Sequence, residues 1–209
     1  MHNDSLHDVA ERGVEKSNVL VPFMEPGDVP WFPAWGVDLN EPINDVGVLV
    51  GDWIEHRPSD RWALIAGPIP SSDRHLWASW HVATRNEERD SMVARTIDAE
   101  FIRILAGTHQ IRLAFDRIGP REGDGHVWIV YLPRTTGIDS NGLLEEYPAH
   151  EPAIELMASD LMPWLNGELR TARPVPNREG ADRLEIPSSE PISGIESSMI
   201  MMAASADIR

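Results

Sequence analysis

The sequence predicts a single α/β domain, on the border of α+β, in which helices flank a small mixed β-sheet. One observation is that short apolar, strand-like runs at 29–39, 61–69 and 126–132 alternate with segments of helical periodicity. Another is the length of 209 residues, which suits one domain large enough to bury a core. A third is that we find no internal repeat. We therefore expect one domain over residues 26–209 and a flexible N-terminal extension over residues 1–25.

The first strand is expected at a sheet edge or confined to its own beginning, because Pro30 and Pro33 cannot donate a backbone hydrogen bond. Asn40 is the expected N-cap of the helix that follows, with Pro42 in its first turn. Apolar residues then recur at i, i+3 and i+4 spacing until that helix ends before Pro58.

The middle of the chain is predicted to be mainly helical. Ser72 or Asp73 is the expected cap of a helix over 71–89. Gly107 is expected to end the next helix, because glycine adopts positive φ at little cost, and Thr108 to cap the helix after it. The remaining expected elements are helices over 92–106 and 152–165, a proline-rich loop or linker over about 171–191, and an apolar, Met-rich stretch over 192–208.

Composition excludes several kinds of protein. The chain has no cysteine, which rules out disulfides, thiolate metal sites and cysteine nucleophiles. No apolar run is long enough for a membrane-spanning helix, and the first residues lack the apolar stretch of a secretory signal, so we expect a cytoplasmic protein. The net charge is −16, and Lys16 is the only lysine. Because molar salt screens such self-repulsion, we favour a halophilic origin over an acidic mesophilic one.

The charge is unevenly distributed along the chain. Residues 74–134 carry nine bases against eight acids, whereas residues 1–73 and 135–209 are strongly acidic. All nine bases are arginines, whose planar guanidinium groups suit phosphate oxygens. They are Arg74, Arg85, Arg89, Arg95, Arg103, Arg112, Arg117, Arg121 and Arg134. Either this segment binds RNA, or its helices expose solvated faces linked by i,i+4 ion pairs.

Four short motifs follow one another in the same segment: His75-Leu76, Ala94-Arg95, Glu100-Phe101-Ile102 and Gly107-Thr108-His109-Gln110-Ile111. In this order they resemble the small subunit of the archaeal and eukaryotic KEOPS complex, the family of the PRPK-binding protein. The last family motif reads Gly-x-Arg-Gln-Ile, and His109 stands here at the position of its arginine. The resemblance covers roughly residues 28–134.

The resemblance implies a subunit of the complex that makes threonylcarbamoyladenosine on tRNAs that read codons beginning with A. In that family this subunit has no active site. It binds the PRPK-like kinase subunit and holds the 3′ CCA tail of the tRNA. We therefore expect the partners of this chain to be a PRPK-like kinase and tRNA, and we expect no DNA.

The residues around the last motif suit RNA chemically. A helix that starts at Thr108 presents unpaired N–H groups to a phosphate, and Gly107 lets a nucleotide approach the backbone. The Gln110 amide can both donate to and accept from a base or a 2′-OH, and His109 can stack on a base. The candidate RNA-binding residues are Arg85, Arg89, Arg95, Gly107, Thr108, His109 and Gln110. The alternative is that Gly107 and Thr108 are only helix caps and Gln110 is a solvated helix residue.

The apolar C-terminal stretch is the candidate surface for the kinase, by analogy with the family and because Met-rich surfaces adapt to partners. Its candidate partner-binding residues are Ile195, Met199, Met202 and Ile208. The alternative is a last core helix.

Two rival functions remain at this stage. One is a protein-interaction scaffold that does not bind RNA. The other is a small hydrolase that uses Ser71, Asp73, His75 and His81, although their spacing fits no hydrolytic mechanism and the two histidines are not at the i,i+4 spacing of a helical metal site. No nucleotide-binding, zinc-protease or nucleophile-elbow motif occurs. We therefore expect a non-enzymatic protein with no cofactor and no metal.

Overall fold

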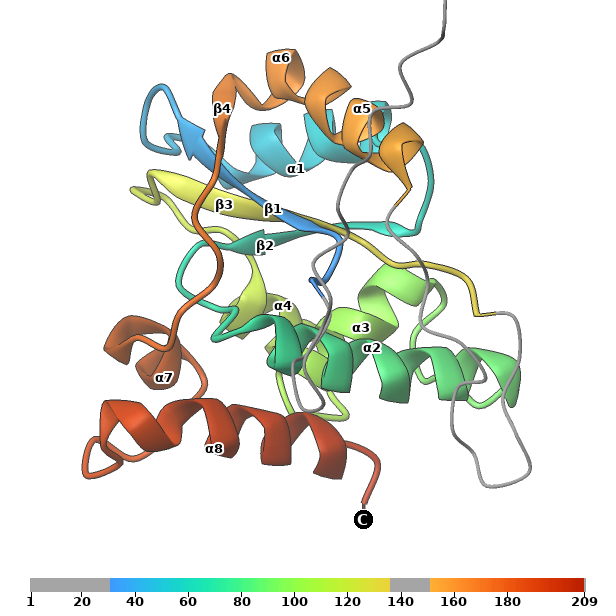
Figure 1. Ribbon diagram of the computed structural model, residues 1–209, viewed down its shortest axis with the longest axis vertical. Helices are drawn as coiled ribbons and strands as arrows, with labels where there is room; N and C mark the ends of the chain where they lie inside the picture. The colour runs from blue at the N-terminus through green and yellow to red at the C-terminus, as the bar shows by residue number, and fades with distance from the viewer. Residues whose placement is uncertain (1–30, 136–150, 209) are drawn as a thin grey trace, which may run out of the picture.

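The computed structural model describes residues 31–135 and 151–208, so the predicted extension over 1–25 lies outside the described residues. One sheet lies between two helical layers, and a further helical pair covers the second of these layers (Figure 1). This arrangement confirms the predicted single α/β domain with a sheet flanked by helices.

The sheet contains β1 (Ala34–Leu39), β2 (Trp62–Ala66), β3 (His126–Tyr131) and β4 (Gly167–Arg170), in the order β2-β3-β1-β4. All its pairings are antiparallel, which corrects the expected mixed sheet. β1 and β2 do run parallel to each other, but β3 lies between them and pairs with both.

The helix α1 (Val46–His56) connects β1 to β2, and it begins later than the sequence suggested. Its N-cap is Asp45, whose carboxylate accepts from the Val48 N–H at 3.1 Å. The expected cap, Asn40, instead donates its side-chain amide to Asn166 at 2.9 Å. Ile43, which lies between Asn40 and Asp45, is buried, and its N–H donates to the Asp124 carbonyl at 3.0 Å. This contact prevents the helix from starting earlier.

Three helices form the layer on the opposite face: α2 (Asp73–Glu88), α3 (Ile97–Leu105) and α4 (Ile111–Ile118). Ser72 caps α2, as predicted. Gly107 ends the α3 segment with a φ of 62°, also as predicted. Thr108 is not the cap of α4: the helix starts after Gln110, and the Thr108 hydroxyl accepts from the Gln110 N–H at 3.1 Å.

The C-terminal part of the chain adds elements to both faces. These are α5 (Pro152–Asp160), α6 (Met162–Leu165), α7 (Arg178–Arg183) and α8 (Ile192–Ser205). The segment expected to be a loop or linker over about 171–191 contains α7, which starts where the Asn177 side chain accepts from the Gly180 N–H. The edge strand β4 was not predicted either, because it has only four residues, Leu169 is its single large apolar side chain, and it is mostly exposed.

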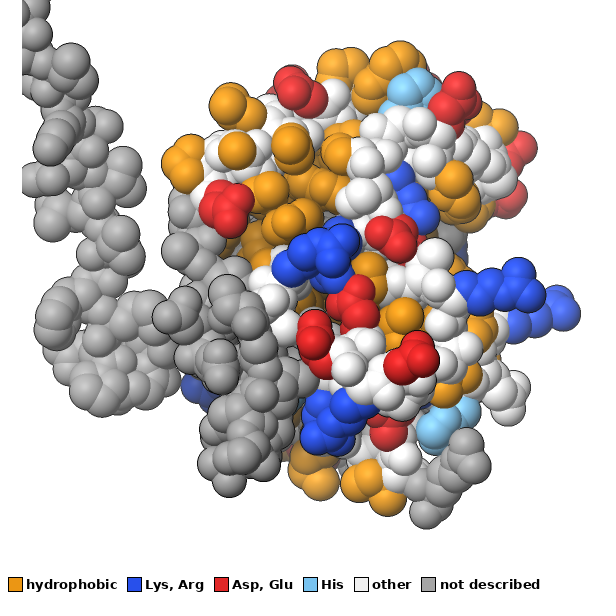
Figure 2. Space-filling view, turned by 90° about the vertical axis from the view of Figure 1, so that its right-hand side faces the viewer, with side chains coloured by type: hydrophobic (Ala, Val, Ile, Leu, Met, Phe, Trp, Pro, Cys, Tyr) orange, Lys and Arg blue, Asp and Glu red, His pale blue; other side chains and the backbone are white. Residues whose placement is uncertain are grey.

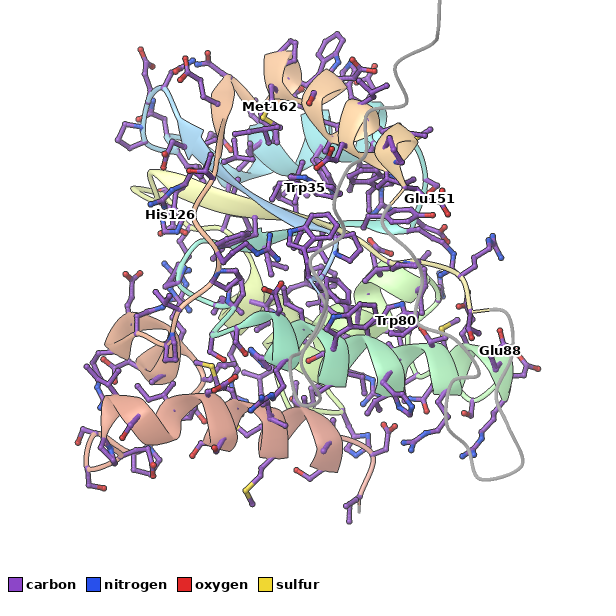
Figure 3. The ribbon with its side chains drawn as sticks, viewed as in Figure 1. Trp35, Trp80, Glu88, His126, Glu151 and Met162 are labelled. Atoms are coloured by element: carbon purple, nitrogen blue, oxygen red, sulfur yellow. The ribbon has the colours of Figure 1, made fainter. Side chains whose placement is uncertain are left out.

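Two buried clusters, one on each face of the sheet, hold these layers together. One cluster includes Trp35 and Trp62 and packs under α1, α5 and α6. The other includes Trp80, Phe101 and Met199 and extends through α2 and α3 to α8. Figure 3 shows Trp35 on the upper side of the sheet and Trp80 on α2 below it. The loops at the ends of α2, α3 and α8 are therefore attached to a continuous core.

The cap of α2 provides a test of the fold. We predict that Ser72→Ala lowers the free energy of unfolding by about 1 kcal/mol, because the Ser72 hydroxyl accepts from the His75 N–H at 3.0 Å. Thr96 occupies the N-cap of α3 without a side-chain cap bond, so Thr96→Ala is the matched control and should cost clearly less. Urea unfolding measures both variants, and equal losses would show that the Ser72 bond contributes nothing.

Candidate RNA-binding surface

The turn from Gly107 to Gln110, which we call the Gly107 turn, lies between α3 and α4. The Gly107 N–H donates to the Ile104 carbonyl at 2.9 Å, and the Thr108 N–H donates to the Arg103 carbonyl at 3.3 Å. A Cβ built on Gly107 would lie 3.1 Å from the Met202 Cε atom of α8. Glycine is therefore required here by its positive φ and by close packing on the C-terminal helix.

The Gly107 turn rests on a buried ionic network centred on Arg103, whose side chain has no exposed surface. Its guanidinium pairs with Glu100, donates to the Asp207 carboxylate at 2.7 Å, and donates to the Thr108 carbonyl at 3.3 Å. The Asn86 amide donates to Glu100 at 2.9 Å and to Asp207 at 2.8 Å. The network thus joins α2, α3, the turn and the C-terminal segment.

Glu100 also fixes the loop that precedes α3. Its second carboxylate oxygen accepts from the N–H groups of Val93 and Ala94 at 3.1 and 3.0 Å. These bonds hold the backbone next to Arg95, one of the predicted RNA-binding residues. The same carboxylate therefore orders two segments that carry candidate residues.

The network keeps both acids ionised. Burial alone would raise the pKa of Glu100, but hydrogen bonds from Arg103, Ala94 and Asn86 outweigh it and lower the pKa below its usual value. Burial likewise acts to raise the pKa of Asp207, and hydrogen bonds from Asn86 and Arg103 reverse the effect. The charge of Arg85 also acts to lower the pKa of Asp207.

Three of the nine arginines in residues 74–134 hydrogen-bond within the domain: Arg103, Arg117 and Arg121. Within the described part of the chain, no hydrogen bond or ion pair engages the side chains of the other six: Arg74, Arg85, Arg89, Arg95, Arg112 and Arg134. The only ion pair between two described residues of that segment joins Glu100 and Arg103. Residues 74–134 therefore do not form helix faces linked by i,i+4 ion pairs.

Arg85 and Arg89 leave the last turn and the C-cap of α2, and Arg95 leaves the loop before α3. Arg89 and Arg95 are exposed, whereas Arg85 is half-buried and its Nε atom meets no partner in the described structure. On the face shown in Figure 2, Arg side chains are interspersed with Asp and Glu rather than joined in one basic field. The surface near the turn can therefore offer separate guanidinium contacts.

The Gly107 turn itself presents polar groups outward. His109 and Gln110 are exposed, and Thr108 is half-buried. The N–H groups of Ile111, Arg112 and Leu113 form the first turn of α4, where no preceding helical carbonyl accepts from them. The positive end of the helix dipole and free N–H groups thus adjoin the side chains of His109 and Gln110.

The predicted partner-binding residues of the C-terminal segment fall into two groups. Ile195 and Met199 are fully buried in the core beneath α8, so their expected exposure to a partner is corrected. They face inward because α8 packs on α2 and α3. Met202 is half-buried against Gly107, and Ile208 is 75% exposed. A shallow groove of about 450 Å³ runs beside them, lined by Ser198, Met201, Met202, Ala204, Ser205 and Ile208.

The residues of the hydrolase hypothesis do not assemble a site. His75 is fully buried, its Nδ1 accepts from the Ser71 N–H at 3.4 Å, and burial lowers its pKa to about 3. Asp73 pairs with Arg173 and also accepts from the Phe32 N–H. His81 is half-buried, and burial, with Arg85, lowers its pKa. The described residues contain no group of His, Asp and Glu that could hold a metal ion.

Asn86 and Asp207 are members of the network beneath the turn that the sequence did not predict, because they lie 121 positions apart. The local signal was the pair Glu100 and Arg103, which with Asp98 are the charged residues of a helix whose other residues are apolar. A charged i,i+3 pair on a buried face indicates a network, but it does not identify the distant members.

In comparisons with known proteins, no protein-family model and no curated protein matches the sequence. Among the described residues, no helix has the length and apolar character needed to cross a membrane. The assignment of a function therefore depends on the site itself and on the resemblance carried by its motifs.

We predict that Arg103→Met destabilises the domain by about 3–5 kcal/mol, because it leaves the buried Glu100 carboxylate without its counter-charge. Arg112→Met is the control, since Arg112 is exposed and makes no ion pair with a described residue. Urea unfolding measures both losses. An Arg103→Met variant as stable as the unmodified protein would contradict the role of the network.

Proposed function

We propose that this chain is the non-catalytic small subunit of a KEOPS complex, binding the tRNA 3′ CCA tail and a PRPK-like kinase subunit. The observation that carries the proposal is the Gly107 turn. It combines free N–H groups of α4, the exposed side chains of His109 and Gln110, and the half-buried Thr108 on a rigid ionic support. The motif resemblance associates the same turn with the tRNA tail.

The chemistry of the turn suits the end of a single strand. Phosphate oxygens accept from the free N–H groups at the start of α4, where the helix dipole favours negative charge. Gln110 can read a base edge, and His109 can stack on a base. Arg85, Arg89 and Arg95 supply guanidinium groups for the phosphates that precede the tail.

The kinase is proposed to contact the exposed part of the C-terminal segment, Met201 and Ile208, beside the groove of α8. Since Asp207 is bound by Arg103 and Asn86, this segment is held at the same network as the turn. The modification chemistry belongs to other subunits, and this chain positions the tRNA. The acidic composition supports work in high salt, where the long-range repulsion between chain and tRNA is screened.

The test compares tRNA with an intact CCA end and the same tRNA trimmed of it, by fluorescence anisotropy over a salt series. We predict tighter binding to the intact tRNA. Arg89→Glu should weaken binding to both and reduce the slope of log K against log salt by about 1 or more, because a phosphate contact is lost. Arg74→Glu is the matched control, since Arg74 is an equally unpaired, exposed arginine at the opposite end of α2.

Equal affinity for intact and trimmed tRNA would overturn the proposal for the tail. If tRNA does not bind while the PRPK-like kinase does, the chain is a protein-interaction scaffold without an RNA role. Equal effects of Arg89→Glu and Arg74→Glu would remove the end of α2 from the path of the strand.

A further inference from the structure

The strand β2 lies at an edge of the sheet, with β3 on one side only. Two hydrogen bonds show which residues of this strand bond to β3. The Leu132 N–H donates to the Arg61 carbonyl at 2.8 Å, and the Gly67 N–H donates to the His126 carbonyl at 3.2 Å. In an antiparallel pair such residues alternate, so Ala63 and Ile65 also bond to β3. The N–H and C=O groups of Trp62, Leu64 and Ala66 therefore point away from the sheet.

Some of these outward groups are engaged within the domain. The Trp62 N–H donates to the Ser59 carbonyl at 3.2 Å, and the Trp62 carbonyl accepts from Arg57 at 3.0 Å. The Ala66 carbonyl accepts from the Ile69 N–H. The N–H and the C=O of Leu64 have no hydrogen-bonding partner among residues 31–135 and 151–208, although Leu64 is buried. An unpaired buried donor and acceptor on one residue is uncommon in proteins.

Leu64 lies in the wall of a groove with a volume of about 740 Å³. One wall is α1, including Trp53 and Ile54, and the opposite wall consists of α3 and α4, including Ile102 and Phe115. Ile54 and Phe115 are 59% and 44% exposed, so both walls offer apolar contact surface. The open edge of β2 is thus flanked by two apolar walls.

The groove also contains a buried carboxylate oxygen without a hydrogen-bonding partner among the described residues. Asp98 is buried, and one of its oxygens pairs with Arg57, the residue that also bonds the Trp62 carbonyl. Its other oxygen, Oδ1, is buried and makes no hydrogen bond with a described residue. Asp116 and Glu122 also line the groove, as does Arg121, so that with Asp98 and Arg57 the lining carries three acids and two arginines. An occupant that carries a cationic group would satisfy the Asp98 oxygen.

We propose that this groove binds an extended segment of a partner protein, which adds as a strand to β2 at Leu64 and directs a cationic side chain to Asp98. A peptide backbone supplies an acceptor and a donor at the spacing that the Leu64 groups require. Apolar side chains on one face of that segment would contact Ile54 and Phe115. Edge strands are usually protected by charge, proline or a bulge, and Trp62–Ala66 contains no charged residue and no proline. This surface is separate from the residues proposed to bind tRNA and does not depend on that function.

The first measurement is amide hydrogen exchange in the full chain. The Leu64 amide is expected to exchange faster than those of Ala63 and Ile65, which bond to β3. A Leu64 amide as protected as its neighbours would overturn the assignment of an unpaired edge.

The second measurement uses acetylated hexapeptides of alternating valine and threonine, with one arginine placed at each position in turn, titrated into ¹⁵N-labelled protein. The amide signals of Leu64 and Ala66 should shift, and the peptide that binds best should slow hydrogen exchange of the Leu64 amide. At one position of the peptide, arginine should be preferred over glutamine. Methylation of the peptide nitrogens one at a time should abolish binding at alternate positions only, since half of them face β2.

Ile54→Asp should weaken the best peptide at least tenfold. Val48→Asp, an exposed site on the same helix outside this groove, is the matched control and should leave its affinity unchanged. Shifts confined to other surfaces, or no shift at Leu64 from any peptide, would overturn the proposal. A concentration-dependent dimer that protects Leu64 without peptide would assign the groove to a second copy instead.

Discussion

A single buried guanidinium, that of Arg103, connects the parts of the chain on which the proposed function depends. It pairs with Glu100, binds Asp207 and supports the carbonyl of Thr108. Each of these contacts satisfies part of a charge that would otherwise be costly to bury. Because the partners come from a helix, a turn and the C-terminal segment, the network determines the relative placement of all three. The Gly107 turn is therefore a preformed surface, and preorganisation reduces the entropy lost on binding.

The arginines of the domain have two different roles: one is buried and supports the fold, and others are exposed and available to contact a ligand. Arg103 is buried and forms its ion pairs inside the domain, whereas Arg89 and Arg95 are exposed and make no ion pair with any described residue. In a chain of net charge −16, exposed arginines are not expected to form a continuous basic field, and the face shown in Figure 2 has Arg side chains interspersed with Asp and Glu. Such a surface would bind RNA through a few specific contacts near the turn, with weak long-range attraction, which is compatible with selection for a tRNA end in high salt.

Local signals in the sequence predicted the elements that local chemistry controls. Ser72 as the cap of α2 and Gly107 at the end of the α3 segment follow from hydrogen bonding and from positive φ, and both were predicted correctly. The misassigned caps of α1 and α4, the antiparallel pairing around β3 and the burial of Met199 depend on contacts between distant segments. The same holds for the site: Arg103 was counted as one of nine possible phosphate contacts, and only its distant partner Asp207 shows that it is structural.

The central claim is that the Gly107 turn, supported by Arg103, binds the end of a single RNA strand. The most direct measurement is an NMR titration of the full chain with a short RNA hairpin that ends in a single-stranded CCA, following the backbone amides. We predict the largest shifts at residues 107–113, with smaller shifts near Arg85, and a much weaker response to the same hairpin without its CCA. Shifts of equal size for both hairpins, or shifts centred away from the turn, would contradict this claim.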